Sequence, residues 1–128
     1  MSTKQHFVKD DIFYGLRNGN STAIVEIYYQ IKEPIGESGD ILLIVSYGAP
    51  GVVVMKIKGH RRIRLQNLTD EDICALGYPD LRVGYRRAEI YPGPRDWFSV
   101  VWDDLHPFKG TTWKDNPMII FYDLEKEE

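Results

Sequence analysis

Hydrophobic and polar residues alternate along several stretches of this chain, and the pattern predicts strands separated by helices. From Ile24 to Ile31 every second residue is apolar, and in a strand these residues share one face. This pattern is typical of a half-buried strand. The apolar run from Ile41 to Val45 is short enough for a buried strand, and Met118 to Leu124 predicts a closing strand after a loop at Lys109 to Pro117.

A hairpin is predicted in the middle of the chain. Alternation from Val52 to Ile57 indicates one strand, Gly59-His60 a tight turn, and Arg61 to Gln66 a second strand. If the two strands pair, most of the positive charges of this region line one strip, because alternate residues of a strand share a face. These charges belong to Lys56, Lys58, Arg61, Arg62 and Arg64.

Apolar residues at helical spacing predict helices between the strands. The first runs from Lys9 to Leu16, and turn-forming residues follow it. Thr69 is suited to cap a second helix, which would end near Gly77. Cys74 lies inside this helix between apolar neighbours and is expected to be buried. Two further helices are predicted, from Asp80 to Glu89 and, with Asp96 as its cap, through Trp97, Val101 and Trp102 to Leu105.

These elements and the composition indicate a single small domain of the α+β class. The chain has 128 residues, of which 43% are hydrophobic and 27% charged, and such values are typical of a globular domain. We expect the domain to cover residues 1–124, followed by an acidic tail at 125–128. No apolar run reaches the ~20 residues of a membrane span, the polar start differs from a signal peptide, and Cys74 has no cysteine partner. We therefore expect a cytoplasmic protein that does not contact membranes.

Positive charge is concentrated in the segment KIKGHRRIR, residues 56–64. The whole chain has a net charge of −3, so removing the five positive charges of this segment leaves −8 for the other 119 residues. Fixed lysines and arginines bind phosphates, which favours a local site for a nucleic acid. The alternative is an edge strand protected by charge against aggregation, and the sequence leaves both interpretations open.

Motifs for other kinds of chemistry are absent from the sequence. It contains no phosphate-binding loop, dinucleotide-binding glycine pattern or nucleophile elbow. His6, His60 and His106 lack the spacing of a zinc site, so we expect neither metal nor cofactor. Strand or loop positions where a ring could stack a base are occupied by Tyr28, Tyr47, Tyr78 and Trp113, although packing in the core is the simpler expectation.

Several short motifs, in their order along the chain, resemble a known family. They are Gly39-Asp40-Ile41-Leu42, the segment LQNLTDEDICALGYP, the helix WFSVVWDDLH and the segment TTWKDNPMIIFYDLE. Together they are similar to the activating signal cointegrator homology (ASCH) domain, which has a PUA-like fold. The resemblance implies a small mixed pseudo-barrel of about five or six strands with flanking helices, and a cleft beside the first helix. It also implies binding of RNA or nucleotides, with Arg17, Asn18, Ser21 and Thr22 around the cleft.

Some small bacterial members of this family are amidohydrolases that act on acetylated cytidine. The sequences of these enzymes are similar to one another in a segment, Gly-basic-Lys-Thr-x-Thr-x-Arg, that follows the first helix. A Glu lies in a later helix. Aligned without gaps, Ser21 stands at the Lys, Ile24 at the second Thr, Glu26 at the Arg and Leu76 at the Glu. A hydroxyl nucleophile needs a neighbouring base, which Ser21 lacks in this alignment, so we expect no catalytic residues.

Three functional hypotheses follow. The first is a non-catalytic module that binds RNA or another nucleic acid through the five basic residues, the cleft and a stacking Trp113. The second is an amidohydrolase-like enzyme on a modified nucleoside, using Ser21 and Thr22. The third is a phage or mobile-element accessory protein that binds a host protein.

Overall fold

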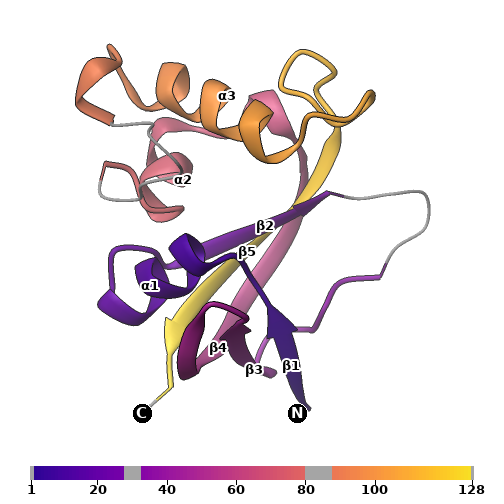
Figure 1. Ribbon diagram of the computed structural model, residues 1–128. Helices are drawn as coiled ribbons and strands as arrows, with labels where there is room; N and C mark the ends of the chain where they lie inside the picture. Colours follow the sequence, from indigo (N-terminus) through magenta and orange to yellow (C-terminus); the bar gives the residue numbers. More distant parts are fainter. Residues whose placement is uncertain (1, 28–32, 80–87, 128) are drawn as a thin grey trace.

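The computed structural model describes residues 2–27, 33–79 and 88–127. Within these ranges five strands form one mixed sheet, so the predicted α+β class is confirmed, but the sheet does not close into the expected barrel (Figure 1). The strands are β1 (Thr3–Phe7), β2 (Ala23–Ile27), β3 (Ile41–Ser46), β4 (Ala49–Arg64) and β5 (Met118–Lys126). The helices are α1 (Asp10–Asn18), α2 (Asp70–Ala75) and α3 (Pro94–Leu105), with short 3-10 turns at Leu65–Asn67 and Ala88–Ile90.

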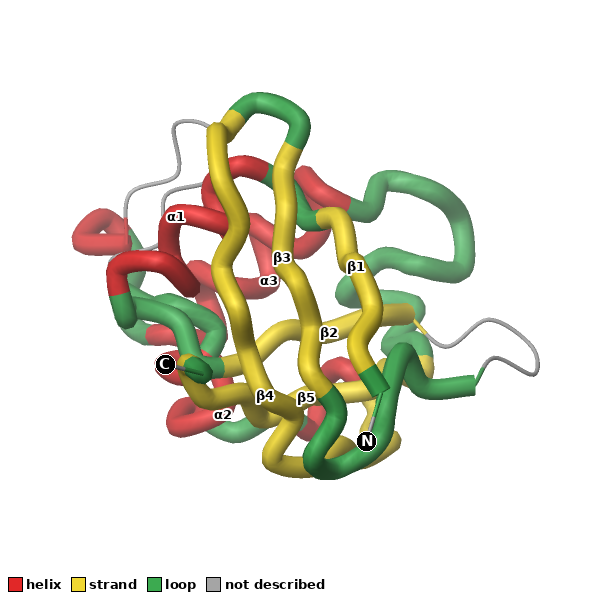
Figure 2. Tube along the Cα trace, turned by 90° about the horizontal axis from the view of Figure 1, so that it is seen from below, coloured by secondary structure: helices red, strands yellow, loops and turns green. Residues whose placement is uncertain are grey.

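The strand order β1-β3-β4-β5-β2 makes β1 and β2 the two edges of the sheet. β1 runs parallel to β3, and every other neighbouring pair is antiparallel. Figure 2 shows β1, β3 and β4 side by side, with β2 and β5 crossing beneath them because the sheet is strongly twisted. Twist therefore turns the two edge strands toward the same region of the molecule.

The strand β5 separates two hydrophobic cores, because its side chains alternate between the two faces of the sheet. Ile119 and Phe121 pack into the core that α2 and α3 cover, which includes Trp97 and Trp102. Ile120 and Tyr122 pack into the core around α1. In Figure 1, α2 and α3 accordingly lie together and apart from α1.

The predicted hairpin at Gly59-His60 is wrong, because β4 is one strand of 16 residues. The chain passes straight through Gly59, where the register with β5 shifts by one residue in a β-bulge. β3 pairs with the first half of β4 and β5 with the second half, so both halves have a partner without a turn.

The continuous strand also divides the positive charges that the hairpin was expected to align. Lys56 lies opposite Glu125 and Arg61 opposite Phe121, on one face, whereas Arg62 lies opposite Ile120. Arg64 shares the face of Arg62, and Lys58 lies at the bulge. The predicted single strip of four charges is therefore not formed.

Two details of the predicted helices are also wrong. Asp96 does not cap α3, which begins at Pro94 after Gly93 and has Asp96 in its first turn. Cys74 is exposed, because the short helix α2 turns Ile73 inward and the next residue projects from another side. The caps at Thr69 and the buried Trp97 and Trp102 agree with the sequence prediction.

Some predictions fall wholly or partly outside the described residues. These are positions 28–31 of the strand predicted from Ile24 and positions 80–87 of the helix predicted from Asp80. Conversely, β1 was not predicted, and β5 extends two residues beyond Leu124. Within the described ranges, no helix has the length and apolar character needed to cross a membrane.

Candidate functional site

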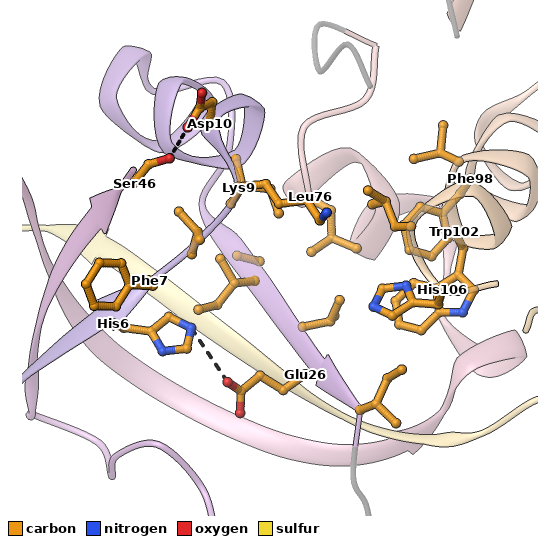
Figure 3. Close-up of a pocket in the computed structure, with 18 of the residues that line it drawn as sticks. His6, Phe7, Lys9, Asp10, Glu26, Ser46, Leu76, Phe98, Trp102 and His106 are labelled. Carbon is orange, nitrogen blue, oxygen red and sulfur yellow. Dashed lines mark hydrogen bonds and ion pairs between the residues drawn. The ribbon is translucent and has the colours of Figure 1, made fainter. Parts of the chain in front are cut away.

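A cavity of about 850 Å³ lies between the two edge strands β1 and β2 (Figure 3). Its size is within the range of small-molecule binding sites. Because the sheet is open here, both hydrophobic cores contribute to its walls. The lining residues come from β1 and the start of α1 (His6, Phe7, Val8, Lys9, Asp10, Ile12), from β2 (Ala23, Ile24, Val25, Glu26, Ile27), from the end of β3 (Ser46, Tyr47) and from α2, α3 and their ends (Leu76, Phe98, Val101, Trp102, Leu105, His106).

A histidine and a carboxylate face each other across the gap between the edge strands. His6 Nε2 of β1 lies 3.6 Å from Glu26 Oε1 of β2. This distance is within the range of an ion pair but is too long for a hydrogen bond. Burial lowers the pKa of His6, although the charge of Glu26 acts in the opposite direction. The lowered pKa favours the uncharged form of His6 at neutral pH.

An aromatic pair forms the opposite end of the cavity in Figure 3. The rings of Trp102 and His106 stack with centroids 3.9 Å apart and planes at 23°. Trp102 Nε1 donates a hydrogen bond of 2.7 Å to the carbonyl oxygen of Thr111, which fixes the indole. Burial lowers the pKa of His106, so this wall also presents a neutral ring.

A second aromatic pair lies in the open, where β1 and β3 end. Phe7 and Tyr47 stack with centroids 4.8 Å apart and planes at 15°, and their exposed fractions are 49% and 91%. The turn that carries Tyr47 is held by Asp10, which accepts hydrogen bonds from Ser46 Oγ and from the Gly48 amide. The outward ring face of such an exposed stacked pair beside a cavity is a surface on which a base can stack.

The residues expected around the family cleft do not line this cavity. Ser21 is buried, and its hydroxyl donates a hydrogen bond of 3.2 Å to the carbonyl oxygen of Leu76. The Thr22 amide donates to the carbonyl oxygen of Ala75, so both residues fasten the end of α2. Arg17 and Asn18 are exposed at the end of α1.

Trp113 is half-buried and packs against the core rather than standing free. Its ring meets Phe98 edge-on with centroids 6.0 Å apart, and the Arg95 guanidinium lies 5.2 Å above it. The Gln66 side chain donates to the Trp113 carbonyl oxygen at 2.7 Å. Stacking of a base on this ring face would require Arg95 to move.

Arg61 and Arg64 of β4 contact other parts of the protein. Arg61 binds Asp72 at 2.5 Å and lies 4.7 Å above the Phe121 ring, and Arg64 Nη1 lies 3.5 Å from the carbonyl oxygen of Asn116. None of the five basic residues, which also include Lys56, Lys58 and Arg62, lines the cavity. The cavity and the basic segment are therefore separate surfaces.

Sequence reasoning did not bring His6 and Glu26 together as one site. His6 and Glu26 are 20 positions apart, on strands that are not hydrogen-bonded to each other, so no local spacing joins them. Trp102 was correctly placed in the core, but one side of it also faces the cavity. No cluster of three or more potential metal ligands occurs among the residues that the structure describes.

Comparison with solved structures identifies the fold. An ASCH domain from Lactobacillus crispatus JV V101 superposes with a TM-score of 0.63 at 13% identity, covering 98% of this chain and 79% of that one. The chain has an ASCH-type fold. A DUF984 protein from Enterococcus faecalis V583 gives a TM-score of 0.64 at 9% identity, with 98% of this chain and 80% of that one covered. No protein-family model and no curated protein sequence matches the chain.

The structure shows where the four positions of the gapless alignment lie. Three of its four positions, Ile24, Glu26 and Leu76, line the cavity, whereas Ser21 does not. Two of the three are apolar, and the third is a carboxylate.

Proposed function

We propose that this ASCH-fold protein is a non-catalytic module that binds single-stranded RNA, with one base held in the cavity between β1 and β2. The observation that carries the proposal is the exposed, stacked pair Phe7 and Tyr47 beside that cavity. Unpaired bases are recognised by stacking on exposed aromatic side chains, each worth roughly 1–3 kcal/mol.

The charges of the lining indicate that a base, rather than a phosphate, occupies the cavity. Lys9 is balanced by Asp10, and Glu26 adds a further negative charge. A phosphate would be repelled by this wall, whereas an uncharged heterocycle would not. The phosphates of neighbouring nucleotides would then lie on the outside, where Lys58 and Arg62 are exposed on β4.

The non-catalytic part of the proposal rests on the positions aligned with the amidohydrolase segment, although His6 and Glu26 elsewhere in the cavity can transfer protons. Ser21 is buried and bonded to the main chain, and the aligned positions Ile24 and Leu76 carry no group that transfers a proton. A hydrolase needs a positioned nucleophile or water together with a base.

The test is fluorescence anisotropy of labelled ten-nucleotide RNA with wild-type protein and Tyr47→Ala, at low and at physiological salt. Tyr47 is almost fully exposed, so its truncation leaves the core intact and should weaken binding about tenfold. Phe108→Ala is the matched control, because Phe108 is also exposed and does not line the cavity. Absence of RNA binding at low salt would refute the proposal.

Charge reversal tests the part assigned to β4. Lys58→Glu with Arg62→Glu should reduce affinity and flatten its dependence on salt, because fewer counterions are released on binding. Lys109→Glu with Lys114→Glu changes the net charge equally on an exposed loop outside the cavity and should have a smaller effect. Equal effects of the two double variants would remove β4 from the proposal.

A further inference from the structure

The carboxylate of Glu26 is a hydrogen-bond acceptor in the wall of the cavity, and His6 does not donate a hydrogen bond to it. Its carboxylate is about one-third exposed and faces the core around α1, because Glu26 lies opposite Ile120 in the sheet. His6 Nε2 lies 3.6 Å away, outside hydrogen-bond range. An ionised carboxylate has two oxygens in one plane and accepts hydrogen bonds on both. In this half-buried position a ligand with N–H groups can satisfy them.

The acidic and basic residues of the lining other than Glu26 lie at a different place. Asp10 accepts hydrogen bonds from Ser46 and Gly48 at the start of α1. Lys9 precedes it there, and Figure 3 shows both apart from Glu26. Glu26 is therefore the charged group that stands at the β2 wall of the cavity.

The edge of β2 adds main-chain groups beside this carboxylate. The Leu124 amide donates to the Thr22 carbonyl oxygen at 2.8 Å, and the pairing continues with Ile24 opposite Tyr122 and Glu26 opposite Ile120. In an antiparallel pair, hydrogen-bonded positions alternate with positions whose main-chain groups point away from the partner. The N–H and C=O of Val25 therefore point toward the gap between the edge strands.

Guanine has the complementary edge. It is the standard base with two adjacent N–H donors, N1–H and the 2-amino group, on its Watson–Crick side, next to the acceptor O6. Two donors match the two oxygens of a carboxylate, and O6 matches a main-chain N–H. Adenine, cytosine and uracil each place an acceptor where guanine has its N1–H donor or lack the second donor.

We infer that Glu26 determines specificity and that the base held in the cavity is guanine. This inference rests on the proposed function, since it names the base that the RNA-binding cavity accepts. A site that hydrogen-bonds a donor discriminates strongly against an analogue without it, because the carboxylate is then left unpaired.

The experiment compares guanosine, inosine and adenosine as ligands of the full chain, with binding followed by NMR shifts of the backbone amides. Inosine differs from guanosine only in lacking the 2-amino group, and adenosine presents an acceptor at N1. We expect guanosine to bind at least about tenfold more tightly than inosine, and adenosine more weakly still. Shifts should be concentrated at Val25, Glu26 and Ile27.

The variant Glu26→Gln should abolish the preference for guanosine, because an amide offers one acceptor and one donor in place of two acceptors. Glu125→Gln is the matched control, since it removes the same charge from an exposed position of β5 outside the cavity. The three nucleosides already test the inference on the wild-type protein, so it remains falsifiable even if Glu26→Gln does not fold.

The outcomes separate the inference from the proposed function. Equal affinities for guanosine and inosine, together with RNA binding that Tyr47→Ala weakens, would overturn the role of Glu26 and leave RNA binding intact. Loss of RNA binding as well would overturn both. A guanosine preference that survives in Glu26→Gln would assign the selectivity to another group and also overturn the inference.

Discussion

Asp10 shows how one side chain positions the mouth of the cavity. It is the first residue of α1, and its carboxylate accepts from Ser46 Oγ and the Gly48 amide in the turn between β3 and β4. This turn carries Tyr47 and places its ring against that of Phe7. A single carboxylate thus links the helix to the exposed aromatic pair.

Replacement of Gly48 should break this link. A Cβ at Gly48 would overlap the Asp10 carboxylate, with Cγ only 2.7 Å away, so Gly48→Ala must displace Asp10 from its hydrogen bonds. We expect Gly48→Ala to lower the free energy of unfolding by roughly 1–3 kcal/mol, measured by urea denaturation. Gly59→Ala is the control, because a Cβ there meets nothing within 4 Å. Equal stability of the two variants would show that Asp10 is not held by this turn.

At the scale of elements, α2 depends on its ends, since a helix of six residues is not stable alone. At its start Thr69 Oγ accepts from the Asp72 amide, while the Asp72 side chain accepts from the Thr69 amide. Arg61 of β4 binds the same Asp72. The Asp72 pKa is lowered by the Thr69 and Arg61 hydrogen bonds, which outweigh the opposing effect of burial, the largest single contribution.

Removal of this cap should destabilise the fold. Thr69→Ala should lower the free energy of unfolding by about 1 kcal/mol, whereas Thr69→Ser, which keeps the hydroxyl, should retain most of it. Thermal unfolding followed by circular dichroism measures both. Identical melting temperatures for Thr69→Ala and the wild type would mean that Arg61 alone suffices to hold Asp72.

Element prediction succeeded where the pattern is local. The capped start of α2 and the buried run of β3 follow from side chains within a few residues of each other. It failed for β1, because four of its five residues are exposed and give no alternation. It also failed at Gly59, because a glycine in a bulge and a glycine in a turn look alike until the partner strand is known.

At the scale of the whole molecule, the open sheet partly buries two histidines at opposite ends of one cavity. Burial lowers the pKa of both His6 and His106 below the ordinary value of 6.5. The unfolded chain therefore binds protons at a higher pH than the folded protein does. The contribution of the two neutral histidines to the free energy of unfolding is fully present above about pH 6.5. It is lost as the pH falls below that value.

We therefore expect the free energy of unfolding to fall as the pH is lowered below about 6.5, measured by urea denaturation at each pH. Carboxylates such as Asp40, Asp72 and Asp115, whose pKa values are lowered from 3.8, act only in more acidic solution. His6→Gln with His106→Gln should reduce the fall, and His60→Gln, outside the cavity, serves as the control. A double variant with an unchanged pH dependence would contradict this account.

The class of fold, most strands and helices and the apolar residues of the core can be predicted from the sequence, because alternation, helical spacing and capping act over a few residues. The basic segment is also evident there, although its division between two faces of β4 is not. The site depends on tertiary packing. The cavity exists because twist brings the edges β1 and β2 together without joining them, which places His6 opposite Glu26. Such a juxtaposition depends on the pairing of the whole sheet, and no short stretch of the chain encodes it.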